Sequence, residues 1–260
     1  MGDISATRPK AATKLVPHDY FDDPVAERYD DELGEWGDPA AVDPAVDVLV
    51  GLAAGGGRAL EFAVGTGRIA LPLSARGVDV HGIELSEAML AQLRAKPGAE
   101  AIQVTVGDMA TTTVDGAFDV VFLVFNTIMN LTSQEEQVAV FRNAAAHLRP
   151  GGCFVIEVMV PQLQRLLRGE TFVPFDVSRD HLGFDEYDVA GQGLVSHHYT
   201  KVRGQFEYVA MPFRYVWPAE LDLMARLAGM TLRSRWSGWR GEPFTAASDK
   251  HVSVWEKPAS

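Results

Sequence analysis

The sequence predicts an α/β fold: a doubly wound, mainly parallel sheet of seven strands with an antiparallel β insertion after the fifth strand. The first observation is a row of short, near-continuous apolar segments between residues 59 and 159, typical of strands buried on both faces. The second is the helical period of the stretches between those segments. The third is a change at residues 161–215, where aromatic and β-branched residues with intervening turn signals indicate two or more antiparallel strands.

Each element follows from its own stretch of sequence. Residues 20–33 and 42–54 space their apolar side chains at near-helical intervals, and a run of three glycines closes the second helix. The alternating part predicts strands at 59–64, 78–83, 102–106, 118–125 and 152–159, and helices at 69–75, 88–94 and 134–148. After the insertion, the pattern predicts a helix at 218–228 and strands at 230–236 and 251–256. Residues 1–17 lack periodicity and are expected to be a disordered tail, so 18–260 is expected to form a single domain.

Composition excludes several classes of function. The chain has 260 residues and a formal net charge of −12, which disfavours a protein that grips nucleic-acid phosphates. Its apolar runs are too short to span a bilayer, and its first residues lack the apolar core of a signal peptide. The single cysteine, Cys153, excludes an internal disulfide framework and a cysteine-rich metal site. We therefore expect a soluble, cytoplasmic protein that does not act on membranes.

The most informative segment runs from Leu60 to Arg68, where a strand ends in small residues and a helix follows at once. Such a turn lets the backbone approach a ligand at the helix N-terminus. It fits two patterns. Gly65 and Gly67, with Glu84 at the end of the next strand, satisfy the dinucleotide fingerprint of nicotinamide enzymes. Read from Glu61 through Ala63, Gly65 and Gly67, the segment instead resembles motif I of the class I S-adenosylmethionine-dependent methyltransferases, with Ala63 replacing the first glycine.

Further pieces favour the methyltransferase pattern. Gly107-Asp108-Met109 follows the third strand, where that family places an acid for the adenine amino group. Phe118 to Val121 and Leu148 to Gly152 are similar to its fourth strand and its entry to the fifth. The resemblance covers roughly residues 58–160 and implies a Rossmann-like methyltransferase fold with S-adenosylmethionine as cofactor.

The resemblance also implies roles for individual residues. Glu61, Ala63, Gly65 and Gly67 would shape the pocket for the methionine part of the cofactor, and Arg68 would pair with its carboxylate. The other expected cofactor contacts are Glu84 and Leu85 at the ribose, Asp108 and Met109 at the adenine, Phe125 at the fourth strand and Tyr29 as a cover. An exposed arginine at position 68 and a core aromatic at position 29 remain the alternative interpretations.

The acceptor side is predicted from topology and from the insertion. Ligands of a doubly wound sheet lie outside the carboxyl ends of its strands, which places Asn126, Glu157 and the loop 236–249 at the rim. The sequence after Asn126 lacks the proline motif of nucleic-acid amine methyltransferases. Residues 161–215 are expected to form a lid and acceptor site, with His197 and Tyr199 on one face and His198 on the other. The candidate catalytic residues are His197, His198 and Asn126, and the candidate substrate contacts are Glu157, Tyr199, Arg214, Trp217 and Trp239. Ordinary packing is the alternative for the histidines and tryptophans.

The sequence thus predicts methyl transfer to a hydroxyl or amine of a small molecule such as a sugar or specialised metabolite, without a metal. Two alternatives stay open: a nicotinamide-dependent oxidoreductase, and a protein that binds the cofactor without catalysis. A homodimer is likewise an open alternative, because the inserted strands offer an interface edge.

Overall fold

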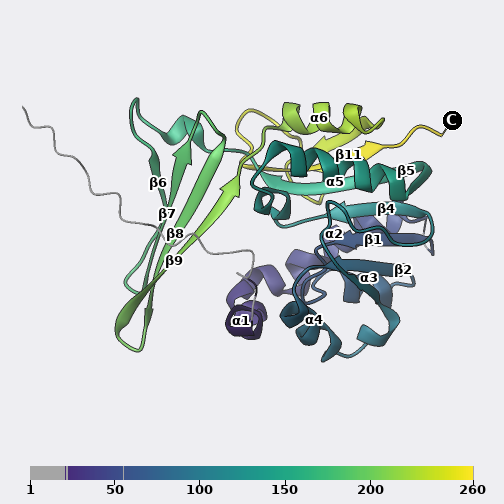
Figure 1. Ribbon diagram of the computed structural model, residues 1–260, viewed down its shortest axis with the longest axis horizontal. Coiled ribbons are helices and arrows are strands. Elements are labelled where there is room, and N and C mark those ends of the chain that lie inside the picture. The colour runs from purple at the N-terminus through teal and green to yellow at the C-terminus, as the bar shows by residue number, and fades with distance from the viewer. Residues whose placement is uncertain (1–20, 22, 55, 260) are drawn as a thin grey trace, which may run out of the picture.

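The computed structural model describes residues 21, 23–54 and 56–259. The predicted tail, residues 1–17, lies outside the described residues. Two sheets organise the described part of the chain (Figure 1). The larger has seven strands in the order β10-β11-β5-β4-β1-β2-β3, and the smaller has four in the order β6-β7-β8-β9.

The large sheet is mainly parallel, as predicted. Its strands are β1 (Arg58–Phe62), β2 (Asp79–Glu84), β3 (Gln103–Val106), β4 (Phe118–Leu123), β5 (Leu148–Met159), β10 (Thr231–Trp236) and β11 (Lys250–Glu256). Strands β1 to β5 pair in parallel, and β11 pairs antiparallel with both β5 and β10. The fifth strand is longer than the predicted 152–159, because β5 begins at Leu148, which pairs with Phe118 before the register shifts.

Helices cover both faces of this sheet. They are α1 (Asp23–Leu33), α2 (Pro39–Leu52), α3 (Ala70–Ala75), α4 (Glu87–Arg94), α5 (Gln134–His147) and α6 (Pro218–Leu227). Short 3-10 helices are η1 (Gly34–Gly37), η2 (Ala99–Ala101), η3 (Thr127–Asn130) and η4 (Leu163–Arg165). One apolar core unites α2, α3 and α4 with the sheet, and a second unites α5 and α6 with the opposite face. This two-sided burial explains why the central strands read as almost unbroken apolar runs.

Local sequence signals fix where several helices begin. The Ser86 hydroxyl accepts a hydrogen bond from the Met89 amide at the start of α4. At α5, Ser133 and Glu136 cap each other's backbone amides in a capping box. Helix α2 begins at Pro39 rather than at the predicted residue 42, because proline is favoured in the first turn of a helix.

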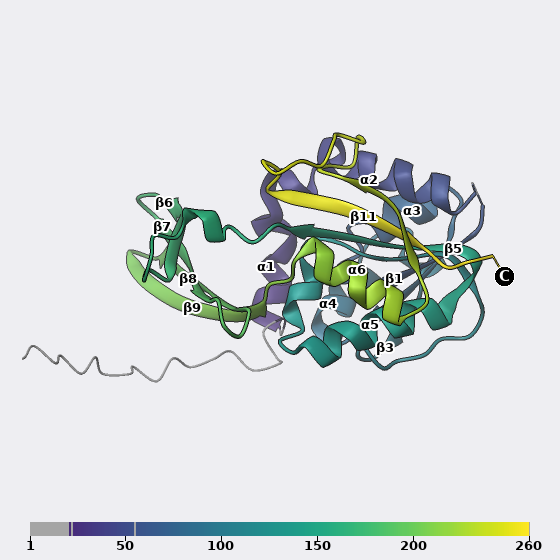
Figure 2. The same ribbon diagram turned by 90° about the horizontal axis from the view of Figure 1, so that it is seen from above.

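The insertion forms a second sheet instead of joining the first. Its strands are β6 (Phe172–Val177), β7 (His181–Asp188), β8 (Gly193–Val202) and β9 (Gln205–Arg214), all antiparallel. It stands at one end of the molecule, with α1 lying between it and the large sheet in both views (Figure 1, Figure 2). Its base joins the core of the α/β part through Val173, Tyr187 and Leu194, whereas its far hairpin extends away.

Candidate active site

The glycine-rich turn after β1 is built on left-handed backbone. Ala63, Gly65 and Gly67 have φ angles of 53°, 56° and 83°. A side chain at Gly67 would collide with Leu93 of α4, so glycine is required for the turn to pack there. Ala63 adopts the same backbone region with a methyl group, at a cost that a glycine there would avoid. The backbone therefore adopts the left-handed conformation at the position of the motif's first glycine, although the residue there is Ala63.

Glu84, at the end of β2, faces this turn. Its Oε2 accepts a hydrogen bond from the Gly65 amide at 2.8 Å, and its Oε1 accepts one from the Ser86 amide at 2.9 Å. Burial raises the pKa of this carboxyl, and the backbone donors of Ser86, Gly65 and Leu85 oppose that rise. Each oxygen keeps a further lone pair, so the group can accept from two hydroxyls of a ligand as well.

Glu61 lies beneath the same turn and is 3% exposed. Burial raises its pKa well above the ordinary value, and the charge of Arg68 opposes the rise. Within the described part of the chain, its Oε2 has no hydrogen-bond partner. An unpaired buried carboxylate oxygen is costly, so this position calls for a donor or cation from a ligand.

A third acid completes the row along the carboxyl ends of the parallel strands. Asp108 follows β3 and is exposed, and its Oδ1 accepts from the Ala110 amide at 2.7 Å. Met109 beside it is buried, whereas Leu85 is 56% exposed next to Glu84. Strand pairing β1–β2–β3 thus sets Glu61, Glu84 and Asp108 in sequence along one edge of the sheet.

Helix α1 is tied to the turn by a group that sequence reasoning missed. The Thr66 hydroxyl donates to Asp30 Oδ1 at 2.6 Å, Lys96 Nζ lies 2.5 Å from Asp30 Oδ2, and the same Nζ donates to the Thr66 carbonyl at 2.8 Å. These three residues hold α1 beside the glycine turn. Tyr29, directly before Asp30 on α1, is partly buried and meets Phe21 edge to face.

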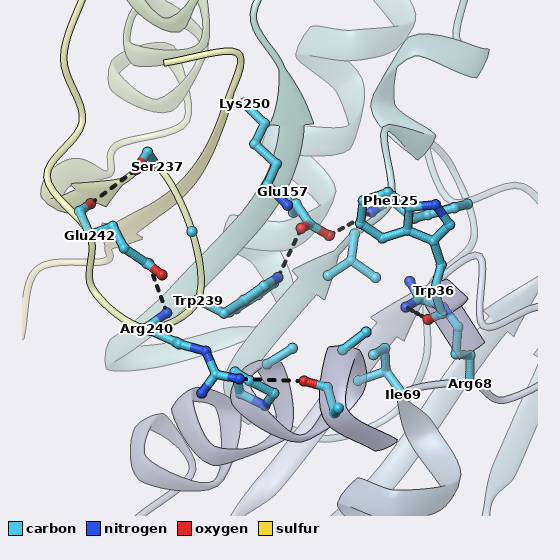
Figure 3. Close-up of a pocket in the computed structure, with 16 residues that line it drawn as sticks. Trp36, Arg68, Ile69, Phe125, Glu157, Ser237, Trp239, Arg240, Glu242 and Lys250 are labelled. Atoms are coloured by element: carbon cyan, nitrogen blue, oxygen red, sulfur yellow. Dashed lines mark hydrogen bonds between the residues drawn. The ribbon is translucent and has the colours of Figure 1, made fainter. Parts of the chain in front are cut away.

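A pocket of about 300 Å³ opens next to the turn (Figure 3). We call it the central pocket. It is lined by Trp36, Ala40, Ala41, Pro44, Ala45, Arg68, Ile69, Val124, Phe125, Glu157, Ser237, Gly238, Trp239, Arg240, Glu242 and Lys250. It lies at the carboxyl ends of β4 and β5, below the loop that joins β10 to β11. Of the predicted residues, Arg68, Phe125, Glu157 and Trp239 meet here.

Glu157, near the end of β5, lines the central pocket. Its Oε1 accepts from the Trp239 indole nitrogen at 2.9 Å and its Oε2 from the Phe125 amide at 3.3 Å (Figure 3). The second bond holds a strained turn, because Phe125 and Asn126 have φ angles of 59° and 63°. Asn126 Oδ1 accepts from the Met159 amide at 2.7 Å, so this predicted catalytic side chain joins the ends of β4 and β5.

The predicted histidines lie on the insertion and outside the central pocket. His197 contacts the Tyr208 hydroxyl at 2.7 Å and Glu186 at 3.3 Å, and it stacks on Phe184. His198 contacts His181 at 3.1 Å, and burial together with that neighbour lowers its pKa. The prediction that His197 and His198 occupy opposite faces is confirmed, because His197 contacts Phe184 and Tyr208 whereas His198 contacts Phe175 and His181. Their catalytic role stays a prediction.

Three predicted acceptor contacts also lie away from the central pocket. Tyr199 packs against the tilted ring of Tyr208 on the insertion, and Trp217 precedes α6 with its ring against Tyr215. Arg214 is 6% exposed and pairs with Glu220 at 2.7 Å, so its charge is already matched inside the protein. Arg214 thereby joins the insertion to the α/β part, and its contact with the acceptor stays a prediction.

Within the described ranges, no cluster of His, Cys, Asp and Glu has the arrangement of a metal site. No helix among the described residues is long and apolar enough to cross a membrane.

Comparison with known proteins identifies the family. Residues 59–152 match the family described as a methyltransferase domain. The cypemycin N-terminal methyltransferase of a Streptomyces species is 31% identical over 203 residues, which cover 76% of this chain and 82% of that protein.

Solved structures agree. The CcbJ methyltransferase from Streptomyces caelestis superposes with a TM-score of 0.80 at 37% identity, covering 91% of this chain and 97% of its own. CalS10, an amino pentose methyltransferase from Micromonospora echinaspora solved with S-adenosylmethionine, shares the fold at a TM-score of 0.67 and 22% identity, covering 90% of this chain and 96% of its own. These relatives are methyltransferases, which argues against the alternative of a nicotinamide-dependent oxidoreductase. The chain belongs to the class I S-adenosylmethionine-dependent methyltransferases, with S-adenosylmethionine as its cofactor.

Proposed function

We propose that this enzyme transfers the methyl group to an amine nitrogen of a small organic acceptor bound in the central pocket. The observation that carries the proposal is the position of this pocket. It shares Arg68 and Ile69 with the glycine turn and reaches Glu157 at the end of β5. Its volume of about 300 Å³ suits a small molecule or the end of a larger one.

The row of acids supports a specific placement of the cofactor. Glu84 would accept from the ribose hydroxyls, and Asp108 with the Met109 amide would hold the adenine beside Leu85. The unpartnered Oε2 of buried Glu61 would accept from the cofactor ammonium group, which removes the cost of leaving that oxygen unpaired. Arg68 would pair with the cofactor carboxylate, and Tyr29 on the anchored helix α1 would cover this end.

The protein's main contribution to this reaction is to align the acceptor nitrogen with the methyl group of the cofactor. The bound cofactor supplies a methyl group on a sulfonium. The acceptor nitrogen attacks the methyl carbon in line with the carbon–sulfur bond, and the sulfur leaves as a neutral thioether. Positioning the acceptor in the central pocket contributes up to roughly 7–11 kcal/mol. Trp36, Phe125 and Trp239 surround the site with apolar surface and limit water. Glu157 would hold the acceptor amine and take its proton, directly or through a water.

Two considerations favour nitrogen over oxygen. The Glu157 carboxylate forms a stronger, charge-assisted hydrogen bond with an ammonium group than with a neutral hydroxyl. The names of several relatives also specify nitrogen: the cypemycin N-terminal methyltransferase, the sugar N-methyltransferase KedS8 and the glycopeptide N-methyltransferase MtfA. A sugar or specialised metabolite remains the expected acceptor class. The lid role of 161–215, a homodimer and a cytoplasmic location remain predictions.

The test uses acceptors that differ only in the attacking atom, such as phenethylamine against 2-phenylethanol and glucosamine against glucose. The enzyme is incubated with S-adenosylmethionine carrying a deuterated methyl group, and products are followed by mass spectrometry. We expect label on the amine of each reactive pair. Label on the hydroxyl members alone would contradict the choice of nitrogen, and failure to bind the cofactor would contradict the placement of its site.

A variant tests the role of Glu157. With a reactive amine, Glu157→Gln is expected to lower kcat/KM by about 100-fold, the usual size of a lost acid–base group, with little change in cofactor affinity. Glu242→Gln is the matched control, since Glu242 lines the same pocket but accepts from the Arg240 amide at 3.0 Å. Equal effects of the two variants would remove Glu157 from the reaction.

A further inference from the structure

Three cations line the central pocket without a partner of opposite charge. Arg68, Arg240 and Lys250 form no salt bridge with any residue that the structure describes. Eight arginines of the described chain pair with carboxylates: Arg28, Arg58, Arg76, Arg94, Arg149, Arg214, Arg233 and Arg235. Other arginines without a salt bridge, such as Arg142 and Arg226, lie exposed on helices outside this pocket. With 35 acidic against 23 basic residues, unmatched cations gathered at one cavity are unexpected.

The contacts of these cations within the protein are neutral. Arg68 donates to the Trp36 carbonyl at 3.2 Å and lies 4.7 Å from the centre of the Phe125 ring. Lys250 Nζ lies 5.3 Å from the centre of the Trp36 ring. Arg240 reaches the Ala40 carbonyl at 3.5 Å, the limit of a hydrogen bond. Carbonyls and ring faces orient the cations but leave their charge unmatched.

The two carboxylates that line the pocket, Glu157 and Glu242, form no salt bridge with these cations either. Glu157 accepts from the Trp239 indole and the Phe125 amide, and Glu242 accepts from the Arg240 backbone amide rather than its guanidinium. The three cations enter the pocket from different sides: Lys250 reaches in beside Glu157, Arg240 lies below Trp239, and Arg68 lies at the glycine turn on the side of Trp36 (Figure 3). Arg68 belongs to that turn, where its charge acts on Glu61.

We propose that the acceptor carries an anionic group, a carboxylate or a phosphate, which Arg240 and Lys250 bind. This inference rests on the proposed function, because it takes the central pocket as the acceptor site. Arg68 is left to the cofactor carboxylate. The anion would sit under the β10–β11 loop while the amine meets Glu157, so Arg240 and Lys250 determine which amines are accepted. Charge-assisted hydrogen bonds to two cations favour an anionic acceptor over its neutral analogue by at least about 10-fold.

Calorimetry on the full chain saturated with S-adenosylhomocysteine tests this with ligands of one shape. The probes are phenylacetate, phenyl phosphate, phenylacetamide and phenethylamine. We expect phenylacetate or phenyl phosphate to bind at least about 10-fold more tightly than phenylacetamide, and the tighter of the two identifies the anion. Arg240→Gln combined with Lys250→Gln should abolish the difference. Arg226→Gln, an exposed arginine of α6 away from the pocket, should preserve it.

Each outcome separates the inference from the proposed function. If the cofactor product binds but the anions show no advantage, or phenethylamine binds best, the anion site is overturned and the methyltransfer proposal stands. If the double variant keeps the preference, Arg240 and Lys250 are not its source and the inference also fails. If S-adenosylhomocysteine itself does not bind, the proposed cofactor placement fails first.

Discussion

At the residue scale, Glu84 couples the shape of the turn to ligand binding. Its two oxygens already accept from the Gly65 and Ser86 amides, so the carboxylate is fixed before the cofactor arrives. A preorganised acceptor costs little entropy on binding. This explains how one side chain can both hold the glycine turn and recognise ribose.

Glu84→Ala is therefore expected to weaken S-adenosylmethionine binding by roughly 10- to 100-fold, the range expected for a lost charge-assisted hydrogen bond. Calorimetry of the purified variant gives the affinity. Glu87→Gln provides the control, because Glu87 lies on the exposed surface of α4 only three residues away. An affinity for Glu84→Ala equal to wild type would show that the ribose is held elsewhere.

Ala63 offers a prediction about stability rather than binding. Its φ of 53° lies in the left-handed region, where a side chain costs about 1–2 kcal/mol. Ala63→Gly relieves that strain but gives the unfolded chain more freedom, so we expect a net gain of roughly 0.5–1 kcal/mol in the free energy of unfolding. Urea denaturation measures it. Ala91→Gly, at an exposed helical position of α4, should show the opposite sign, and a loss at both sites would contradict the strain at Ala63.

At the element scale, α1 depends on the group formed by Thr66, Asp30 and Lys96. Thr66 is 1% exposed, so removing its hydroxyl leaves Asp30 without a buried donor. Such a loss costs about 1–3 kcal/mol. Because the group connects α1 to the glycine turn, its loss should destabilise the packing of α1 against that turn more than the rest of the fold.

Thr66→Val keeps the shape of the side chain and should raise hydrogen exchange of the α1 amides by about 10-fold, with slower exchange kept in the central strands. Thr111→Val, at an exposed position without a hydrogen bond from its hydroxyl among the described residues, is the control. Unchanged exchange in α1 would mean that other contacts hold the helix.

The elements themselves were largely predictable, and their contacts were not. Apolar runs identified the strands β1 to β4 within about two residues. Thr66, Asp30 and Lys96 gave no signal, because residues far apart in sequence meet only after folding. Glu157 and Trp239 were predicted from the rule that ligands lie at the carboxyl ends of strands. Arg240 and Lys250 were missed, since the loop around them has no periodicity that marks which side chains point inward.

At the scale of the whole molecule, the insertion and the α/β part are joined through a buried polar network. Arg214 ends β9 and reaches Gln137 of α5 and Glu220 of α6. Glu220 also accepts from Gln192 and Gln134. Burial alone would raise the pKa of Glu220, but these donors, led by Arg214, lower it. The native state therefore favours the charged carboxylate.

We expect this network to give Arg214 a structural role, and Arg214→Met tests that expectation. Removing one member of a buried pair leaves Glu220 uncompensated and is expected to cost about 3–5 kcal/mol in the free energy of unfolding. Because the folded pKa of Glu220 is depressed, its stabilisation is full above the unfolded value near 4.5 and is lost as pH falls through the folded value. The variant should therefore lose most stability at neutral pH and show a smaller loss on acidification than wild type. Urea titrations at pH 7 and pH 4 measure both effects, with cofactor affinity as the independent readout. A variant with normal stability but poor acceptor binding would instead return Arg214 to the acceptor site.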